Sequence, residues 1–155
     1  MTNHIFHDFR FTSEVPKELI EKYTAILPSQ IIRIWNEYGF GSVINGYLRI
    51  INPEMYRGLL TETYLRNNEN CTPLFTTAMG DVLFFENNGE NDQYIIQINY
   101  RKGATKVVAS GVDLFFKFLE EVPFREKALS WSPYLEAVDK FGEPSTMNVL
   151  DTSLF

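Results

Sequence analysis

The chain of 155 residues is most simply one domain, and it is long enough to bury a hydrophobic core. Its composition, 45% hydrophobic and 15% aromatic, excludes a disordered chain, and no window approaches the roughly 18 uncharged apolar residues that a membrane helix needs. The net charge of −6 disfavours direct binding to the phosphates of nucleic acid.

The N-terminus and the cysteine content bear on the compartment. The opening residues lack the basic region and apolar core of a secretory signal. A single cysteine, Cys71, excludes an internal disulfide and a cysteine-rich zinc site. We therefore expect a soluble protein of the reducing cytoplasm.

The acidic excess is uneven, because it gathers in residues 66–92 and 132–155. Ordinary solubility accounts for such an excess. The alternative is an acidic face that meets a basic partner, where opposite charges would raise the rate of association.

The first third of the sequence has helical periodicity and predicts two helices, over 16–26 and 28–38. Pro16 and Pro28 suit the first turns of these helices, and Gly39 suits a left-handed C-cap of the second. The apolar residues at helical spacing are Leu19, Ile20, Tyr23 and Ile26 in the first helix, and Ile31, Ile34, Trp35 and Tyr38 in the second.

A short strand, roughly residues 46–51, and a third helix over 53–64 complete a helical opening that spans 14–65. Asn52 is the expected N-cap of the third helix, and Pro53 suits its first turn. The side chains expected to be buried on this helix are Tyr56, Leu59, Leu60 and Thr63.

The middle of the sequence changes to a period of two, which predicts a sheet over residues 73–109. Asn88-Gly89 and Lys102-Gly103 are hairpin-turn signals, so neighbouring strands are expected to be antiparallel. The predicted strands are 73–80, 81–87, 93–100 and 105–110.

Helical periodicity returns over residues 111–142. Ser110 and Asp113 have the spacing of a capping box, and Ser132-Pro133 begins a last helix that Gly142 closes. The Phe115, Phe116 and Leu119 side chains are expected in the core. The resulting fold class is α+β, with an antiparallel sheet of about five strands against which N-terminal and C-terminal helices pack.

The glycines of the opening block do not form a ligand loop. Gly39, Gly41 and Gly46 do not match G-x-G-x-x-G, and they follow a helix, whereas dinucleotide loops follow a strand. Gly39 is expected to end the helix, while Gly41 and Gly46 permit a tight turn into the sheet.

Few residues suit catalysis or metal binding. The only histidines, His4 and His7, have Asp8 beside them, but a metal site needs three or four ligands that converge, so we expect no metal and no cofactor. Asp81 and Glu86 would lie on opposite faces of a regular strand, which argues against a carboxylate pair. Asp81 is interpreted as a turn residue that bonds local backbone amides, and no catalytic residue is assigned.

Three blocks, "IWNEYGFGSVINGYLRIINPEMYRGLL", "PLFTTAMGDVLFFE" and "YLEAVDKFG", resemble the bacterial GAD-like domain proteins. The resemblance covers residues 14–142 of what would be a single domain over 1–155, and the sequence departs from the family after Gly142. A more distant likeness, in the opening, is to the SUKH superfamily. The residues that carry the family pattern are Trp35, Gly39, Gly41, Gly46, Asn52, Pro53, Gly80 and Asp81.

The GAD-like family includes immunity proteins against type VI secretion DNase effectors. The resemblance implies an inhibitor that is not an enzyme and that binds one cognate toxin, a basic nuclease, in a 1:1 heterodimer by occluding its active site or substrate groove. Charge and expected exposure select the candidate contacts, which are Glu86, Asn88, Glu90, Asp92, Trp131, Tyr134 and Glu136. Two alternatives stay open: a module that binds a small molecule or peptide on the same fold, and a carboxylate enzyme that uses Asp81 or Glu86.

Overall fold

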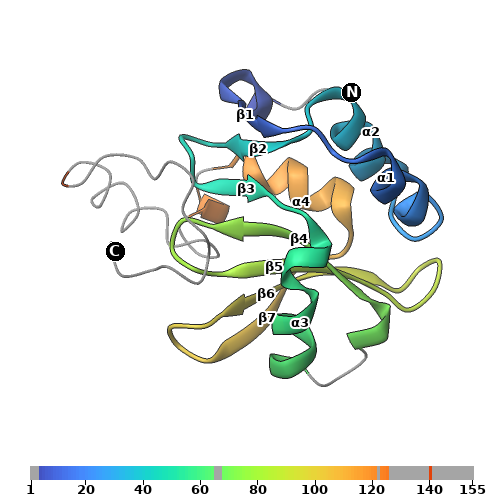
Figure 1. The fold of residues 1–155 in the computed structure, drawn as a ribbon. Helices are drawn as coiled ribbons and strands as arrows, with labels where there is room; N and C mark the ends of the chain where they lie inside the picture. The colour runs from blue at the N-terminus through green and yellow to red at the C-terminus, as the bar shows by residue number, and fades with distance from the viewer. Residues whose placement is uncertain (1–3, 65–67, 122, 126–139, 141–155) are drawn as a thin grey trace.

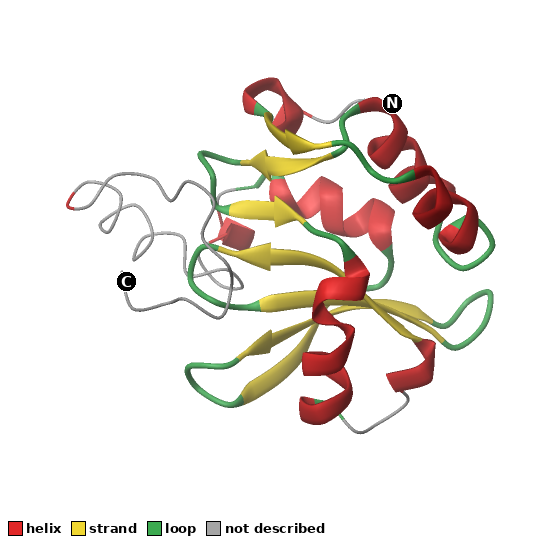
Figure 2. Cartoon of the chain, in the orientation of Figure 1, coloured by secondary structure: helices red, strands yellow, loops and turns green. Residues whose placement is uncertain are grey.

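The structure, a computed structural model, describes residues 4–64, 68–121, 123–125 and 140. In this part of the chain, seven strands form one antiparallel sheet, and each strand pairs with its neighbours in the sequence (Figures 1 and 2). The strands are β1 (Arg10–Ser13), β2 (Phe40–Val43), β3 (Leu48–Ile50), β4 (Cys71–Thr77), β5 (Val82–Asn87), β6 (Gln93–Asn99) and β7 (Ala104–Ala109).

The helices cover both faces of this sheet. Alternation along β5 divides its side chains, since Leu83 and Phe85 join the larger core cluster whereas Val82 and Phe84 lie under α3. Figure 1 shows α3 in front of the sheet and α4 behind it. The helical elements are η1 (His4–Asp8), α1 (Lys17–Tyr23), α2 (Ser29–Glu37), α3 (Pro53–Thr63), η2 (Asn68–Asn70) and α4 (Val112–Leu119).

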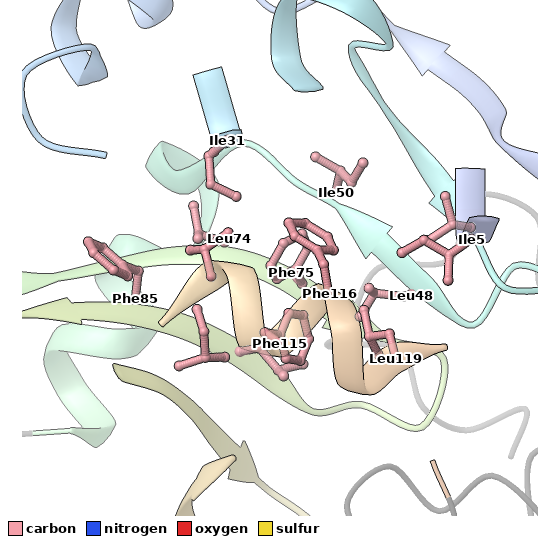
Figure 3. Packing of buried hydrophobic residues seen from close by; sticks show 14 of the residues in the cluster. Ile5, Ile31, Leu48, Ile50, Leu74, Phe75, Phe85, Phe115, Phe116 and Leu119 are labelled. Atoms are coloured by element: carbon pink, nitrogen blue, oxygen red, sulfur yellow. The ribbon is translucent and has the colours of Figure 1, made fainter. Parts of the chain in front are cut away.

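The larger core cluster fills the space between the sheet and α1, α2 and α4. Phe115 and Phe116 of α4 lie against Phe75 of β4, with ring centroids 5.4 and 5.9 Å apart (Figure 3). Trp35 of α2 is buried and contacts the Tyr23 ring edge to face. The burial expected of Trp35 and of the α4 phenylalanines is confirmed, and these aromatic contacts supply much of the apolar area removed from water.

The α+β class and the antiparallel sheet are confirmed, but the sheet has seven strands where about five were expected. The additional strands, β1 and β2, have four residues each. All four residues of β1 are exposed, so β1 shows no alternation of apolar and polar positions. Long-range pairing, Arg10 with Ser42 and Phe11 with Gly41, defines both strands.

Two helix boundaries differ from the prediction. The first helix ends at Tyr23, and Ile26, expected on its buried face, is 44% exposed while Leu27 is buried in its place. The cap of α4 is Gly111, which has φ +120° and makes no side-chain cap bond, so the capping box predicted at Ser110 is wrong.

On α3, Tyr56 and Leu60 are buried as expected, whereas Thr63 is exposed.

The glycine block, which consists of Gly39, Gly41 and Gly46, provides a helix end, a close strand contact and a turn. Gly39 follows α2 with φ +82°, and its N–H donates to the carbonyls of Ile34 and Trp35, which confirms the C-cap. Gly46 has φ +79° in the turn between β2 and β3, as expected. Gly41 instead lies within β2, where a Cβ would come 2.2 Å from the Arg10 carbonyl oxygen, so close strand contact requires this glycine.

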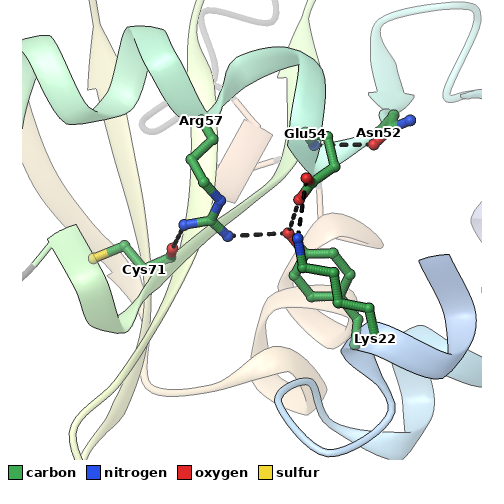
Figure 4. Close-up of polar contacts among 6 residues, drawn as sticks. Lys22, Asn52, Glu54, Arg57 and Cys71 are labelled. Carbon is green, nitrogen blue, oxygen red and sulfur yellow. Dashed lines mark hydrogen bonds and ion pairs between the residues drawn. The ribbon is translucent and has the colours of Figure 1, made fainter. Parts of the chain in front are cut away.

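The start of α3 follows the sequence signals. The Asn52 side chain accepts a hydrogen bond from the Glu54 N–H at 2.9 Å, and Pro53 occupies the first helical position. Both expected roles are therefore confirmed. The cap fixes the direction in which α3 leaves the sheet, with the Glu54 side chain directed toward α1 (Figure 4).

Glu54 joins α3 to α1. Its carboxylate accepts hydrogen bonds from the Tyr23 hydroxyl and, at 3.1 Å, from the Lys22 ammonium (Figure 4). Arg57 donates to the Tyr23 hydroxyl and to the Cys71 carbonyl, at 3.1 Å in each case, which ties α3 to the start of β4. Three elements that are distant in the sequence are held together by this network.

Acid is expected to weaken this network. The hydrogen bond from Tyr23, and then the one from Lys22, lowers the pKa of Glu54 below its ordinary value of 4.5. A lowered folded-state pKa stabilises the fold above the unfolded-state pKa, and this contribution is lost as the pH falls through the folded-state value. We expect Glu54→Gln to reduce the free energy of unfolding by about 1 kcal/mol at neutral pH, a small value because the side chain is 41% exposed.

Urea unfolding of the wild type and Glu54→Gln from about pH 5 to about pH 2 tests this expectation, and the difference should shrink toward the acid end. Glu62→Gln, at an exposed position of the same helix, is the matched control and should show no such trend. A difference for Glu54→Gln that is constant with pH would contradict an ionic origin.

Candidate partner-binding surface

The turn between β5 and β6 is an acidic hairpin tip, defined by residues 88–92. The Asn88 N–H donates to the Asp92 carbonyl at 3.0 Å, and the Asp92 N–H donates to the Gly89 carbonyl at 3.1 Å. All residues of the tip are exposed. The carboxylates of Glu90 and Asp92 therefore extend into solvent from a backbone that is closed by its own hydrogen bonds.

Glu86 lies below this tip and is buried, with 7% of its surface exposed. Its carboxylate accepts hydrogen bonds from the Tyr64 hydroxyl at 3.0 Å and from the Asn88 side-chain amide at 2.6 Å, and the Cys71 thiol lies 3.6 Å away. The exposure expected of Glu86 was wrong, because alternation along β5 turns it inward beside the residue that follows α3. Its contact with Asn88 instead positions the hairpin tip.

A hollow of about 660 Å³ lies beside the tip, on the face of the sheet that carries α3. We call it the acidic hollow. The Tyr94 hydroxyl bonds the Asp92 carboxylate, and this contact, followed by the charge of Asp92, raises the pKa of Tyr94 above its ordinary value. The hollow is lined by Tyr64, Asn70, Glu86, Asn88, Asp92, Tyr94, Ile96 and Val107.

Five residues of the acidic hollow were not singled out from the sequence, namely Tyr64, Asn70, Tyr94, Ile96 and Val107. Tyr64 follows α3, Tyr94 belongs to β6, and Val107 belongs to β7, where its side chain is 57% exposed. Each fits an ordinary helical or strand pattern, so no local signal marks them.

Asp81 is fully buried at the other end of β5. Its carboxylate accepts a hydrogen bond from the Gln97 amide at 2.7 Å and lies 3.5 Å from the Arg101 guanidinium, while burial raises the pKa of Asp81. Local backbone bonds come instead from the Thr77 hydroxyl, which accepts from the Asp81 N–H at 3.1 Å. The expected turn role was therefore wrong for the Asp81 side chain, although Gly80, with φ +91°, makes the turn.

The structure places Asp81 and Glu86 in separate hydrogen-bond networks, at opposite ends of β5. They do not converge on one site. Cys71 is equally unsuited to nucleophilic chemistry, because burial, followed by the charge of Glu86, raises the pKa of its thiol to about 12.

Asp8 has a structural role beside the N-terminal histidines. Its carboxylate accepts from the backbone N–H groups of Ile44, at 3.1 Å, and Asn45, at 2.7 Å, in the turn between β2 and β3. Among the described residues, no group of three or more His, Cys, Asp or Glu side chains is arranged to hold a metal ion. Within the same ranges, no helix is both long and apolar enough to cross a membrane.

A second hollow, of about 560 Å³, lies between α2 and α4. Phe6, Tyr38 and Phe116 contribute aromatic surface to it, and the rings of Phe6 and Tyr38 stack with centroids 4.5 Å apart. Gln30 on α2 donates to Asp113 on α4 at 2.6 Å. Charged residues also line this hollow, namely Arg33, Glu37, Asp113, Lys117 and Glu120.

The other expected contacts, Trp131, Tyr134 and Glu136, lie outside the described residues, as does the helix predicted over 132–142 apart from residue 140. The described candidate surface therefore consists of the hairpin tip and the acidic hollow. It combines exposed carboxylates with tyrosine and valine surface. This combination suits recognition by contact and does not assemble a catalytic group.

The fold and this surface define the class: an α+β protein with one antiparallel sheet and a candidate binding face beside α3. The chain belongs to the GAD-like domain family, because the family model matches residues 4–100, more than half of its length. Among solved structures, the chain is similar to Atu4351 from Agrobacterium tumefaciens, with a TM-score of 0.69, 15% identity, and coverage of 91% of this chain and 71% of that one. At this identity the likeness shows the fold alone. No functionally curated protein matches the sequence.

The family match supports the resemblance found in the sequence, but the two cover different residue ranges. It begins at residue 4, so it includes η1 and β1, and it ends at residue 100, after β6. The resemblance from the sequence extended over 14–142. Both ranges contain the glycine block and the Thr77–Asp81 turn. Gly39, Gly46 and Gly80, which have positive φ, lie in these two segments.

Proposed function

We propose that the protein is an immunity protein that binds and neutralises a cognate toxin, a basic nuclease effector of type VI secretion. The complex is a cytoplasmic 1:1 heterodimer, and the immunity protein occludes the active site or substrate groove of the toxin. This mechanism needs no reactive group, cofactor or direct contact with nucleic acid. Binding alone abolishes toxicity.

The observation that carries this proposal is the juxtaposition of the hairpin tip with the acidic hollow. Glu90 and Asp92 present carboxylates from a backbone that is already folded, so little conformational entropy is lost on binding. Tyr64 and Tyr94 supply amphipathic surface of the kind enriched at protein interfaces. A nuclease carries a basic groove for phosphates, and this acidic surface complements it.

Affinity purification of the tagged protein from its native cytosol, with mass spectrometry of what is bound, tests the proposal. Co-expression with the protein encoded directly upstream is the positive control. We expect a stoichiometric basic partner whose toxicity to a bacterial host is cancelled by co-expression. A protein that purifies without a partner and leaves the toxicity of its neighbour unchanged would contradict the proposal.

The hollow between α2 and α4 favours a second candidate, a module that binds a small molecule or peptide. Its volume of about 560 Å³ lies within the range of ligand pockets, roughly 300–1,000 Å³. Its stacked Phe6 and Tyr38 rings and its charged rim would orient a ligand. Native mass spectrometry of the same purified protein distinguishes the candidates, because a ligand of low mass would replace the protein partner.

A further inference from the structure

β7 is the last of the described strands in the sheet, and β6 is its one strand neighbour among them. Residues 104–107 are exposed and pair with β6 in regular register, since the single irregularity lies further along, between Ile95 and Ile96. The opposite edge, β1, has four residues and a register shift between Phe11 and Ser13, whereas the shift in β7, at Val108, leaves the run 104–107 unbroken. Because such shifts obstruct further pairing, β7 is the more open edge.

The two faces of β7 differ in chemistry. Val107 is opposite Ile96 and Thr105 is opposite Ile98, and directly opposed residues share a face. Ile96 and Ile98 belong to the cluster under α3, so Val107 and Thr105 lie on that face. Lys106 is opposite Gln97 and lies on the other face.

The position of Lys106 matters because lysine on an edge strand usually discourages pairing. On β7 that charge is directed to the α4 face, and the α3 face keeps an exposed valine. Exposed β-branched surface on an open edge favours pairing with another strand. The α3 face of this edge strand therefore presents exposed apolar surface.

This side of β7 is continuous with the acidic hollow. Val107 lines the hollow together with Ile96 and Tyr94 of the neighbouring strand, and Asp92 and Glu86 contribute carboxylates to it. A strand added to β7 would lie about 4.8 Å from it, with every second side chain on the α3 face. Those side chains would extend over Val107 toward the carboxylates.

We propose that β7 is a docking edge on which the partner adds an extended strand, and that this strand carries basic residues at alternate positions, facing the acidic hollow. The inference rests on the proposed function for the identity of the partner. Main-chain hydrogen bonds supply affinity in this mode of binding, and alternate side chains supply specificity. The negative hollow selects lysine or arginine at those positions.

A second copy of this chain is a poorer occupant. Pairing of β7 with β7 would bring two acidic hollows together, each with the carboxylates of Asp92 and Glu86. The net charge of −6 opposes such a contact further. Charge complementarity therefore favours a basic strand from another protein.

Two blocked hexapeptides are the probes, one of alternating lysine and valine and one of alternating glutamate and valine. Titration of the isotopically labelled protein, followed by NMR of the backbone amides, should give shifts at residues 104–107 and at Tyr94 with the basic peptide. We expect a dissociation constant of about 1 mM or lower for it, and binding of the acidic peptide that is at least roughly tenfold weaker.

Val107→Lys tests the edge directly, because it places a charge on the α3 face of an exposed position and leaves the core unchanged. It should weaken binding of the basic peptide by roughly tenfold or more. Lys106→Gln, on the same strand but on the opposite face, is the matched control and should change the affinity less than about twofold. Equal effects of the two substitutions would overturn the proposal.

Shifts confined to another part of the protein would overturn it as well, and so would a concentration-dependent dimer that protects β7. The outcome is separable from the proposed function. If the co-expressed toxin is neutralised while hydrogen exchange of residues 104–107 in that complex stays fast, the docking edge is refuted and the immunity function stands. If the basic peptide pairs with β7 but no toxin is bound, the edge stands and the immunity function fails.

Discussion

Replacing Gly41 by alanine is expected to destabilise the protein by about 2 to 3 kcal/mol, the upper part of the range for overpacking. A Cβ at this position would lie 2.2 Å from the Arg10 carbonyl oxygen and 2.6 Å from the nearest carbon of the Phe9 ring. The oxygen belongs to the backbone of β1, so a side-chain rotation cannot relieve the contact. β1 would have to separate from β2.

Thermal unfolding should show a decrease in the melting temperature of roughly 4 to 10 °C for Gly41→Ala. Gly58→Ala is the matched control, because Gly58 is exposed within α3 and a Cβ there meets nothing within 4 Å. That change should stabilise the protein by about 0.8–1 kcal/mol through helix propensity. A Gly41→Ala protein as stable as the wild type would show that β1 does not pack on β2 as described.

The sequence predicted those helices and strands whose signals lie within a few neighbouring residues. The strands from β3 to β7 and the cap at Asn52 follow from alternation, turn residues and capping, each of which is legible within a few residues. β1 and β2 could not be predicted in this way, because the pairing of Arg10 with Ser42 defines them, and the two Asp8 hydrogen bonds hold the turn that follows β2. Such contacts join segments more than thirty residues apart.

The candidate site was predictable only in part, for the same reason. Asn88-Gly89 predicted the hairpin turn, and the acidic residues around it predicted a charged tip. Alternation also put Asp81 and Glu86 on different faces, but it could not show that the Tyr64 hydroxyl covers Glu86. Whether a polar strand residue is buried depends on which side chains of other elements pack over it. Those contacts are set by the tertiary fold and cannot be seen in the local sequence.

Reversing the two exposed charges of the hairpin tip, in the double variant Glu90→Lys, Asp92→Lys, should slow association with the toxin. We expect the association rate to fall by roughly 10- to 100-fold at low salt, because complementary charges steer the encounter of the two proteins. Glu86 is left unchanged, since reversal of a buried, hydrogen-bonded carboxylate would unfold the protein before it reported on binding. Stopped-flow measurement of binding over a range of salt concentrations gives the rates.

The salt dependence and a matched control separate steering at the tip from a general effect of net charge. At about 1 M salt the Debye length falls to about 3 Å, so the rates of the wild type and the double variant should converge. Glu120→Lys, Glu121→Lys changes the net charge equally, at exposed positions after α4, the helix on the other face of the sheet. Its effect should be several-fold smaller, because screening limits each charge to its own surroundings. Equal slowing by both pairs would mean that net charge alone governs the encounter, and the tip would then have no special part in binding.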